Sequence, residues 1–217
     1  MKSPQRILET VFAFPPNRET LGGTAYLIQI DEGNVLVDCP AWSDETQEFL
    51  HREGGVRWMV ITHRTAKGKA REVQAAMDCQ IIMQEQEAYL LPNLMLTSFH
   101  RRHEVNPQVE VFWTPGHTPG SSCVYYRAEG GILFSGRHLL PDRQGNPVPL
   151  RLPKTFHWRR QVRHTQQLLD DFSSETLRYL CPGANTGYLR GQRVIRDAYK
   201  KLAMLDTDAC LSANSGF

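Results

Sequence analysis

Apolar and polar residues follow two different periods along the chain. Short runs of aliphatic and aromatic residues, bounded by glycine, proline or asparagine, are typical of strands. The strands predicted in this way span residues 7–14, 25–30, 35–38, 57–62, 79–84, 108–113, 122–127, 132–136 and 177–181. Between them, apolar positions three or four residues apart indicate amphipathic helices. The predicted helices span residues 44–53, 67–77, 85–91, 158–172 and 192–205.

Helices and strands alternate most regularly between residues 44 and 84. Such alternation predicts an α/β fold in which helices cover sheets. Three segments show neither period: 92–107 is expected to be a loop-like insert, 141–157 to be irregular, and 206–217 to be a frayed, flexible tail. Since no linker or short repeat divides the chain, residues 1–217 are predicted to form a single domain.

Composition narrows the classes of function. The chain of 217 residues has 25 Lys and Arg against 23 Asp and Glu, and its net charge of +2 gives no overall attraction to nucleic acid. Its five cysteines form no Cys-x-x-Cys pair, which favours reduced thiols and a cytoplasmic location. No stretch approaches the roughly 20 apolar residues that a membrane helix needs, so a membrane is not an expected partner.

Two histidines have distinctive positions, one directly after a predicted strand and the other within a predicted turn. The strand predicted at 57–62 ends in Thr62 and is followed by His63, a short turn and a helix. Residues 114–120 read Thr-Pro-Gly-His-Thr-Pro-Gly around His117. Three other predicted strands end at polar or turn-forming residues. These are Asp38, Ser135-Gly136 and Cys181-Pro182-Gly183.

Taken in this order, the segments resemble the metallo-β-lactamase fold superfamily, which also contains glyoxalase II and the tRNA-maturing ribonucleases of the ribonuclease Z type. The resemblance runs from about Gly22 to Tyr188, and the segment around His117 is its most specific part. It implies a four-layer αββα sandwich with a site at one edge. Members of the superfamily typically bind two metal ions there, through histidines and aspartates.

This chain departs from the first metal-binding motif of the superfamily, His-x-His-x-Asp-His. The resemblance places His63 at the first histidine, and that histidine alone is kept. At the other three places of the motif stand Thr65 for the second histidine, Lys67 for the aspartate and Gly68 for the last histidine.

The later motifs are altered as well. His117 is kept, but Arg137 replaces the aspartate that bridges the two metals. Ala184, or Asn185 with a shift of one residue, takes the place of the final histidine. The resemblance therefore implies two ligands at the first metal position and none at the second.

These departures predict a degraded metal site. Zinc sites use three or four ligands, so two imidazoles without a carboxylate hold zinc poorly. Lys67 and Arg137 at carboxylate positions would repel a metal ion, since two unit charges ~4 Å apart interact by about 4 kcal/mol at an effective dielectric of ~20. We expect no metal cofactor, and we expect groups such as Asp38 to neutralise the two cations.

The main hypothesis is a non-catalytic protein. Its cationic pocket would bind a small anionic ligand, or the chain would serve as a scaffold for a protein partner. A helix starting near Lys67 would add free N–H groups that favour negative charge. The competing interpretation is a salt-bridged relic that binds nothing. The predicted ligand-binding residues are Asp38, His63, Thr65, Lys67, His117, Arg137, His138 and Asn185.

A hydrolase is the first alternative. His63 and His117 could hold one zinc or iron ion if a third ligand approached them. The candidates for this third ligand are His138, His100 and His103. Such an altered mononuclear site would act on an ester, a thioester or a phosphoester.

An RNA-binding relative of the nuclease branch is the second alternative. It would use the basic residues at 100–103 and 151–164. A solvated helix face explains these residues more simply, so nucleic acid is not an expected partner.

Overall fold

Seven strands form the first β-sheet of the computed structural model, which describes residues 3–212. They lie in sequence order and span Gln5–Arg6 (β1), Val11–Ala13 (β2), Tyr26–Ile28 (β3), Val35–Val37 (β4), Trp58–Ile61 (β5), Gln80–Gln84 (β6) and Leu96–Phe99 (β7). Neighbours from β1 to β4 are antiparallel, and those from β4 to β7 are parallel. Parallel strands inside a covered sheet are buried on both faces, which suits the continuous apolar run of β5.

Six strands form the second sheet, in the order β15-β14-β11-β10-β9-β8. They span Arg102–Asn106 (β8), Val109–Trp113 (β9), Ser122–Tyr126 (β10), Ile132–Gly136 (β11), Tyr179–Pro182 (β14) and Ile195–Arg196 (β15). The β11–β14 pair is parallel, and the other neighbours are antiparallel. A separate two-stranded sheet consists of Leu140–Pro141 (β12) and Pro147–Val148 (β13).

Helices connect the strands and cover the sheets. The α-helices span Asp44–Arg52 (α1), Ala70–Met77 (α2), Glu85–Ala88 (α3), Trp158–Asp171 (α4), Ala198–Leu202 (α5) and Thr207–Ser212 (α6). Short 3₁₀ helices span Arg18–Thr20 (η1), Arg64–Ala66 (η2), Ala128–Gly130 (η3) and Thr186–Leu189 (η4). Ser43 caps α1 by accepting a hydrogen bond from the Thr46 N–H, as its position in the sequence predicts.

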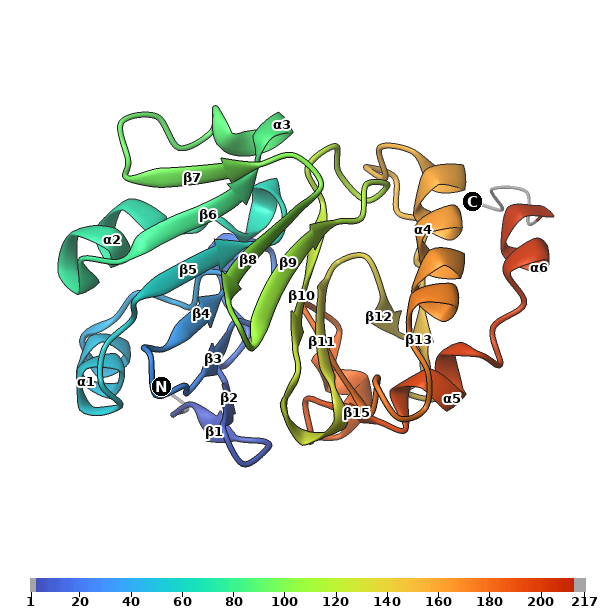
Figure 1. Cartoon of the computed structure of the whole chain (residues 1–217), viewed down its shortest axis with the longest axis horizontal. Helices are drawn as coiled ribbons and strands as arrows, with labels where there is room; N and C mark the ends of the chain where they lie inside the picture. The colour runs from blue at the N-terminus through green and yellow to red at the C-terminus, as the bar shows by residue number, and fades with distance from the viewer. Residues whose placement is uncertain (1–2, 213–217) are drawn as a thin grey trace.

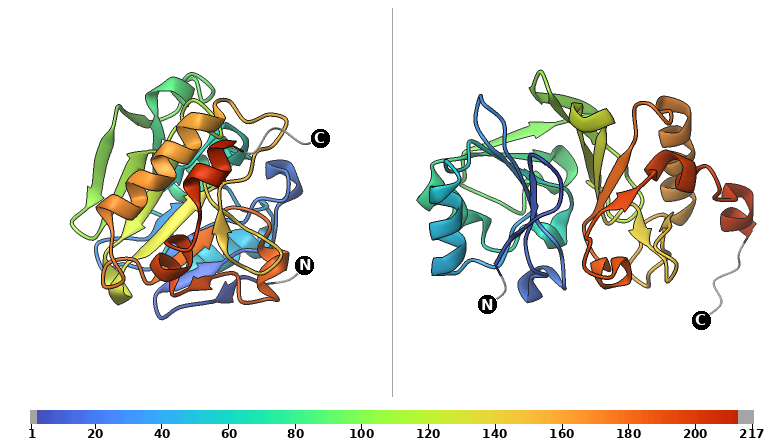
Figure 2. Two further views of the ribbon diagram at one scale, coloured as in Figure 1. Left: turned by 90° about the vertical axis from the view of Figure 1, so that its right-hand side faces the viewer. Right: turned by 90° about the horizontal axis from the view of Figure 1, so that it is seen from below.

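Three apolar clusters hold four layers together. Alternate residues of each strand point to opposite faces, so Val60 of β5 joins the cluster between the sheets while its neighbour Met59 joins the cluster beneath α1 and α2. On the outer face of the second sheet, Leu168 of α4 and Leu202 of α5 pack against the strands. Figures 1 and 2 show the helices on the two outer sides of the paired sheets. The predicted αββα sandwich is therefore confirmed.

Two segments predicted to be irregular contain strands. The expected loop at 92–107 forms β7 and β8, and the expected irregular stretch at 141–157 contributes β13. The side chains of β8 are mostly polar, so no local apolar pattern marks it. Pairing of β8 with β9 supplies the hydrogen bonds that make it a strand.

The last helix predicted from the sequence, at 192–205, is confirmed only over its second half, as α5. Ile195 and Arg196 pair with β14 as β15, and Asp197 has a left-handed backbone with a φ of 52° that separates β15 from α5. Residues 207–212, predicted as part of a frayed tail, form α6. The indole of Trp158 donates to the Cys210 carbonyl and ties α6 to α4. The rest of the predicted tail, 213–217, lies outside the described residues.

Between residues 3 and 212, the structure has no helix with the length and apolar character needed to cross a membrane.

Candidate functional site

A buried hydrogen-bonded chain leads from Asp38 to His63 at the end of β5. The N–H and the hydroxyl of Thr62 each lie 2.8 Å from Oδ1 of Asp38, and the hydroxyl is also 2.8 Å from Oδ2. The same hydroxyl lies 2.9 Å from Nδ1 of His63. All three residues are buried. Thr62 therefore orients both the carboxylate and the imidazole, and it leaves Nε2 of His63 without a partner among residues 3–212.

The electrostatics of this chain are set mainly by burial. Burial raises the pKa of Asp38 to about 7, although hydrogen bonds from Thr62 and the charge of Arg137 act in the opposite direction. Burial and nearby positive charge hold the pKa of His63 well below its usual value and lower the pKa of His117 to about 4. Both imidazoles are consequently neutral at pH 7.

Arg137 follows β11 and extends toward the first half of the chain. Its Nη2 donates to the carbonyl oxygens of Thr20 and Leu21 at 3.1 and 2.7 Å. Its Nε is buried and has no hydrogen-bond partner within the described part of the chain. Gly136, with a φ of 51°, makes this turn possible, because a Cβ there would lie 2.5 Å from Oγ1 of Thr62.

Arg137 forms no ion pair with any residue of the described range 3–212, and the same holds for Lys67. The predicted neutralisation of Arg137 by Asp38 is therefore not a direct contact. Burial lowers the pKa of Arg137, and Asp38 offsets only part of this effect by attracting the guanidinium at longer range. The carboxylate oxygens of Asp38 are instead bonded to Thr62.

A cleft of about 530 Å³ opens above these residues. It is lined by Leu21, Arg64, Thr65, His117, Thr118, Arg137, Leu152, Pro153, Lys154 and Phe156. Three of these residues are cationic, four are apolar, and none of the lining residues within the described chain is acidic. One of the cations, Arg64, is already paired, because its Nε donates to the buried Glu87 carboxylate at 2.8 Å.

The structure brings four of the predicted ligand-binding residues to this cleft. Thr65, His117 and Arg137 line it. The ring of His63 lies edge-on to that of His117, with 5.3 Å between the ring centroids. Oγ1 of Thr65 and Nδ1 of His117 are buried without partners among residues 3–212. Asp38 does not line the cleft itself and is connected to His63 through the hydroxyl of Thr62.

Lys67 lies beside this group rather than within it. It lines an adjoining shallow groove of about 450 Å³, which shares Leu21, Arg64 and Thr65 with the cleft. The α-helix predicted to begin near Lys67 begins at Ala70, so its free N–H groups lie further along the chain than expected. The groove and the cleft are therefore neighbours, and the groove contains Glu19, which pairs with Lys69, besides Lys67.

His138 and Asn185 lie apart from the cleft. Nε2 of His138 is 3.3 Å from the hydroxyl of Thr165, and its carbonyl accepts from Gln161, so the residue packs against α4. Burial there lowers the pKa of His138 to about 3. Asn185 is exposed at the start of η4, with a left-handed φ of 57°. Neither residue lines the cleft.

The side chains present do not fit a resident zinc or iron ion. His63 and His117 are the available ligands, and no group of three His, Cys, Asp or Glu residues suited to a metal occurs between residues 3 and 212. His138 faces α4, and Nδ1 of His100 is bound to Glu85. The charge of Arg137 beside the two imidazoles opposes a cation further.

Several residues that line the cleft are not among those predicted from the sequence. Lys154 and Phe156 belong to the basic stretch 151–164, which was interpreted as a solvated helix face, but they precede α4. Leu21 carries no pattern that would mark it as a site residue. The sequence feature that indicates a site here is the apolar Phe156 within a basic, proline-containing segment.

A second groove, of about 460 Å³, lies between β9 and α4. It brings the two basic segments together, because Arg102 lines it and the guanidinium of Arg160 lies 5.0 Å from the ring centroid of Trp113. Arg102 is already paired with Glu110 and Asp171, at 3.5 and 3.4 Å. Acidic neighbours thus reduce the positive charge on which RNA binding would depend.

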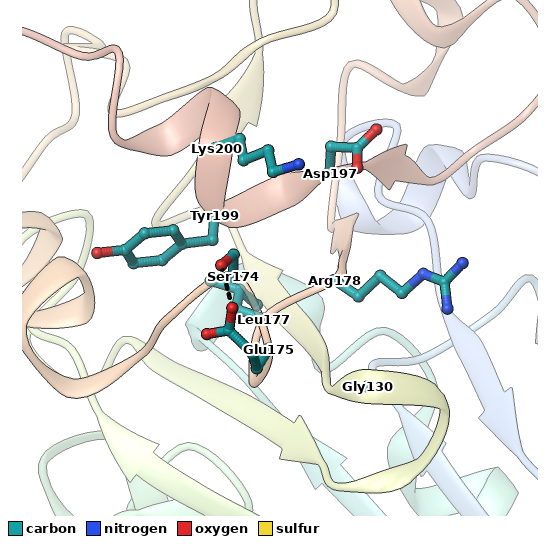
Figure 3. Close-up of a pocket in the computed structure, with 8 residues that line it drawn as sticks. All are labelled: Gly130, Ser174, Glu175, Leu177, Arg178, Asp197, Tyr199 and Lys200. Carbon is teal, nitrogen blue, oxygen red and sulfur yellow. Dashed lines mark hydrogen bonds between the residues drawn. The ribbon is translucent and has the colours of Figure 1, made fainter.

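A further hollow, of about 370 Å³, lies near α5 and is drawn in Figure 3. Arg178 and Lys200 share it with Glu175 and Asp197, so its charges balance. Ser174 donates to the Glu175 carboxylate within it. We refer to it below as the balanced hollow.

Comparison with solved structures places the fold among known proteins. The metallo-β-lactamase DIM-1 has a TM-score of 0.71 at 17% identity, over 95% of this chain and 96% of that protein. The structure of VMB-1 has a TM-score of 0.71 at 14% identity, over 97% and 96%. An N-acyl homoserine lactone hydrolase has a TM-score of 0.55 at 16% identity, over 76% and 89%. No protein-family model and no curated protein sequence matches the chain. The predicted metallo-β-lactamase fold is confirmed.

Proposed function

We propose that this chain of metallo-β-lactamase fold is a non-catalytic protein that binds a small anionic ligand in the cleft beside Arg137. Positive side chains would take the place of metal ions in balancing the charge of the ligand. The cleft offers Arg137 and Lys154 to an anion, and its lining contains no carboxylate between residues 3 and 212.

One observation carries the proposal. A salt-bridged relic requires a carboxylate against Arg137, yet the guanidinium has no ion-pair partner in residues 3–212. Arg137 is only partly buried and lines the cleft, so an anion can reach its guanidinium there without displacing a carboxylate. Arg137 is also fixed in place, because its Nη2 bonds to two backbone carbonyls. A pre-positioned guanidinium loses little side-chain entropy on binding.

The neutral imidazoles contribute less directly to anion binding. Since the pKa of His117 is about 4, His117 adds no charge at neutral pH, but its Nδ1 and the Nε2 of His63 remain buried without partners among the described residues. Both nitrogens have almost no accessible surface, so a ligand in the cleft would reach them only after a movement of the surrounding side chains. The cations would supply the attraction, and the neutral imidazoles would add no charge of their own.

The test is titration calorimetry with sulfate at low ionic strength. We expect the parent to bind sulfate and Arg137→Gln to lose at least about tenfold in affinity, since a hydrogen bond to a charged group contributes about 1.5–3 kcal/mol. Arg178→Gln in the balanced hollow is the matched control and should leave the affinity unchanged. If Arg137→Gln unfolds, Lys154→Ala at an exposed position serves instead. Equal affinities in parent and cleft variants, or an equal loss in the control, would refute the proposal.

A mononuclear hydrolase is the second candidate, because His63 and His117 place two unpartnered ring nitrogens in one buried spot of the described structure. Elemental analysis after purification without chelator separates the two. The anion-binding proposal predicts less than about 0.1 equivalent of zinc, iron or manganese per chain, since structural and catalytic sites alike need at least three ligands. A content near one equivalent that disappears in His117→Ala would favour the hydrolase.

A scaffold role with a protein partner and a cytoplasmic location stay predictions. RNA binding also stays a prediction, and the pairing of Arg102 with Asp171 weighs against it.

A further inference from the structure

One wall of the cleft is apolar and open to solvent. Leu21 and Phe156 are 62% and 51% exposed, and both line the cleft. Leu152 and Pro153 continue the same wall. Exposed apolar surface that is gathered in a concave place provides contact area for an apolar group of a ligand.

The cationic and apolar parts belong to one hollow. Arg137 and Lys154 line the same 530 Å³ as the four apolar residues. We infer that the ligand is an organic anion with an apolar tail, in the class of short- and medium-chain acyl or aryl carboxylates. This inference rests on the proposed function, because the anionic head would bind to the same cations.

Leu21 combines an exposed side chain with an unfavourable backbone conformation. Leu21 has a φ of 56° and a ψ of 45°, in the left-handed region that disfavours a leucine. Its N–H donates to the Arg18 carbonyl at 3.0 Å, which closes the turn of η1. Since little of the side chain is buried within the fold, the strain is not offset by packing, and the apolar surface is left available to a ligand.

The segment that carries Phe156 is held in place as well. The N–H of Phe156 donates to the His117 carbonyl at 3.0 Å. Before it, the N–H of Thr155 donates to the Leu152 carbonyl at 2.9 Å, and the Thr155 hydroxyl accepts from the Leu152 N–H at 2.8 Å. The segment 152–156 is thus a hydrogen-bonded turn fastened to a site residue, which fixes Phe156 over the cleft.

The proposed sites for the anionic head and the apolar tail of the ligand are linked through Arg137. The guanidinium that would bind the head donates to the Leu21 carbonyl at 2.7 Å, so the cation and the apolar rim keep a fixed spacing. A ligand of matching length would gain from both contacts without reorganising the cleft.

The test is calorimetry with a series of carboxylates: acetate, butyrate, hexanoate and octanoate, with sulfate as the tail-free anion. Burial of a methylene group is worth at most about fourfold in affinity, and we expect two- to fourfold per methylene because the wall is partly open. Phe156→Ser should flatten this dependence and leave sulfate binding unchanged. Met204→Ser, at an 80% exposed position away from the cleft lining, is the control and should keep the full dependence.

The outcomes separate the two proposals. Sulfate binding with equal affinities for all four carboxylates would overturn the apolar-tail inference and leave the proposed function standing. A chain-length dependence that persists in Phe156→Ser would also overturn the inference, because the tail would bind elsewhere. Binding of neither sulfate nor any carboxylate would overturn both. A dependence lost in Phe156→Ser and kept in Met204→Ser would support the inference.

Discussion

The cleft and the balanced hollow each contain arginine and lysine, yet they differ in what surrounds these cations. In the balanced hollow, Arg178 and Lys200 lie with Glu175 and Asp197, as Figure 3 shows. In the cleft, Arg137 and Lys154 lie with apolar side chains and neutral imidazoles. The number of cations is therefore a poor guide to an anion site. The absence of carboxylates from the lining within residues 3–212 is the feature that distinguishes the cleft.

The two hollows differ also in the freedom of their side chains. Arg137 is held by two backbone carbonyls. Arg178 lies over the ring of Tyr179, with 5.3 Å between its Cζ and the ring centroid, and forms no ion pair within residues 3–212. An anion at the balanced hollow would have to compete with Glu175 and Asp197 in a solvated place, where charge interactions are weak.

The largest effect is expected from placing a carboxylate in the cleft. Leu21→Asp adds a negative charge beside Arg137 at an exposed residue, and aspartate tolerates the left-handed backbone there. Sulfate affinity should fall by about thirtyfold, because a nearby unit charge contributes about 2 kcal/mol at an intermediate dielectric. Leu21→Asn is the control of equal size and should keep sulfate binding within about twofold. If both variants lose equally, charge does not distinguish the two hollows.

A smaller effect is expected from pH. The pKa of Asp38 is raised to about 7, so its carboxyl is neutral below pH 7 and negative above it. The imidazoles of His63 and His117 stay neutral throughout pH 6 to 8, since both pKa values are lowered. The charge beneath the cleft thus becomes more negative by one unit as pH rises. Sulfate affinity should fall by about fivefold between pH 6 and pH 8, since a unit charge several ångströms away contributes about 1 kcal/mol.

The control for this pH dependence is Asp38→Asn, which has no carboxyl to titrate. Its sulfate affinity should be constant between pH 6 and pH 8. Sulfate itself does not titrate in this range, so calorimetry at the two pH values reports the protein alone. An affinity that rises with pH, or an equal slope in Asp38→Asn, would show that Asp38 does not act on the cleft.

A still smaller effect is expected from converting the balanced hollow. Glu175→Gln with Asp197→Asn leaves Arg178 and Lys200 without carboxylates in that hollow, and asparagine suits the left-handed backbone at position 197. With Arg137→Gln present to silence the cleft, the variant should gain weak sulfate binding, with a Kd above roughly 10 mM because surface charges are screened. Chemical shift changes near Lys200 would detect it. Affinity equal to that of the original cleft would show that the apolar walls are irrelevant.

The αββα fold could be predicted because its local signals agree with its tertiary contacts. The apolar runs at 57–62 and 79–84 form β5 and β6, and both are buried. The strand β8 could not be predicted, because its sequence is polar and its pairing partner β9 defines it. Strand formation of this kind depends on a neighbour and not on the segment itself.

The site could be predicted in part, from the resemblance to the metallo-β-lactamase fold superfamily. That resemblance marks Thr65, His117 and Arg137, and these three residues line one cleft. His138 follows Arg137 directly, but the two side chains leave the end of β11 in different directions, one toward Leu21 and the other toward Thr165. Lys154 and Phe156 lie on a turn without periodicity, so only the folded chain brings them to His117.

The smallest effect concerns Leu21 itself. A leucine in the left-handed region costs about 1–2 kcal/mol, and its side chain is 62% exposed, so Leu21→Gly should raise the free energy of unfolding by about 1 kcal/mol. For a chain of this size, that change raises Tm by about 2–4 °C in calorimetry. The same variant should lose severalfold in octanoate affinity and keep its sulfate affinity, because the cations are untouched. Tyr188→Gly, at another position with an exposed large apolar side chain, lacks the left-handed strain and should not be stabilised. A stabilised Leu21→Gly protein that binds octanoate as tightly as the parent would show that the strained rim serves no ligand, and the cleft would then differ from the balanced hollow in charge alone.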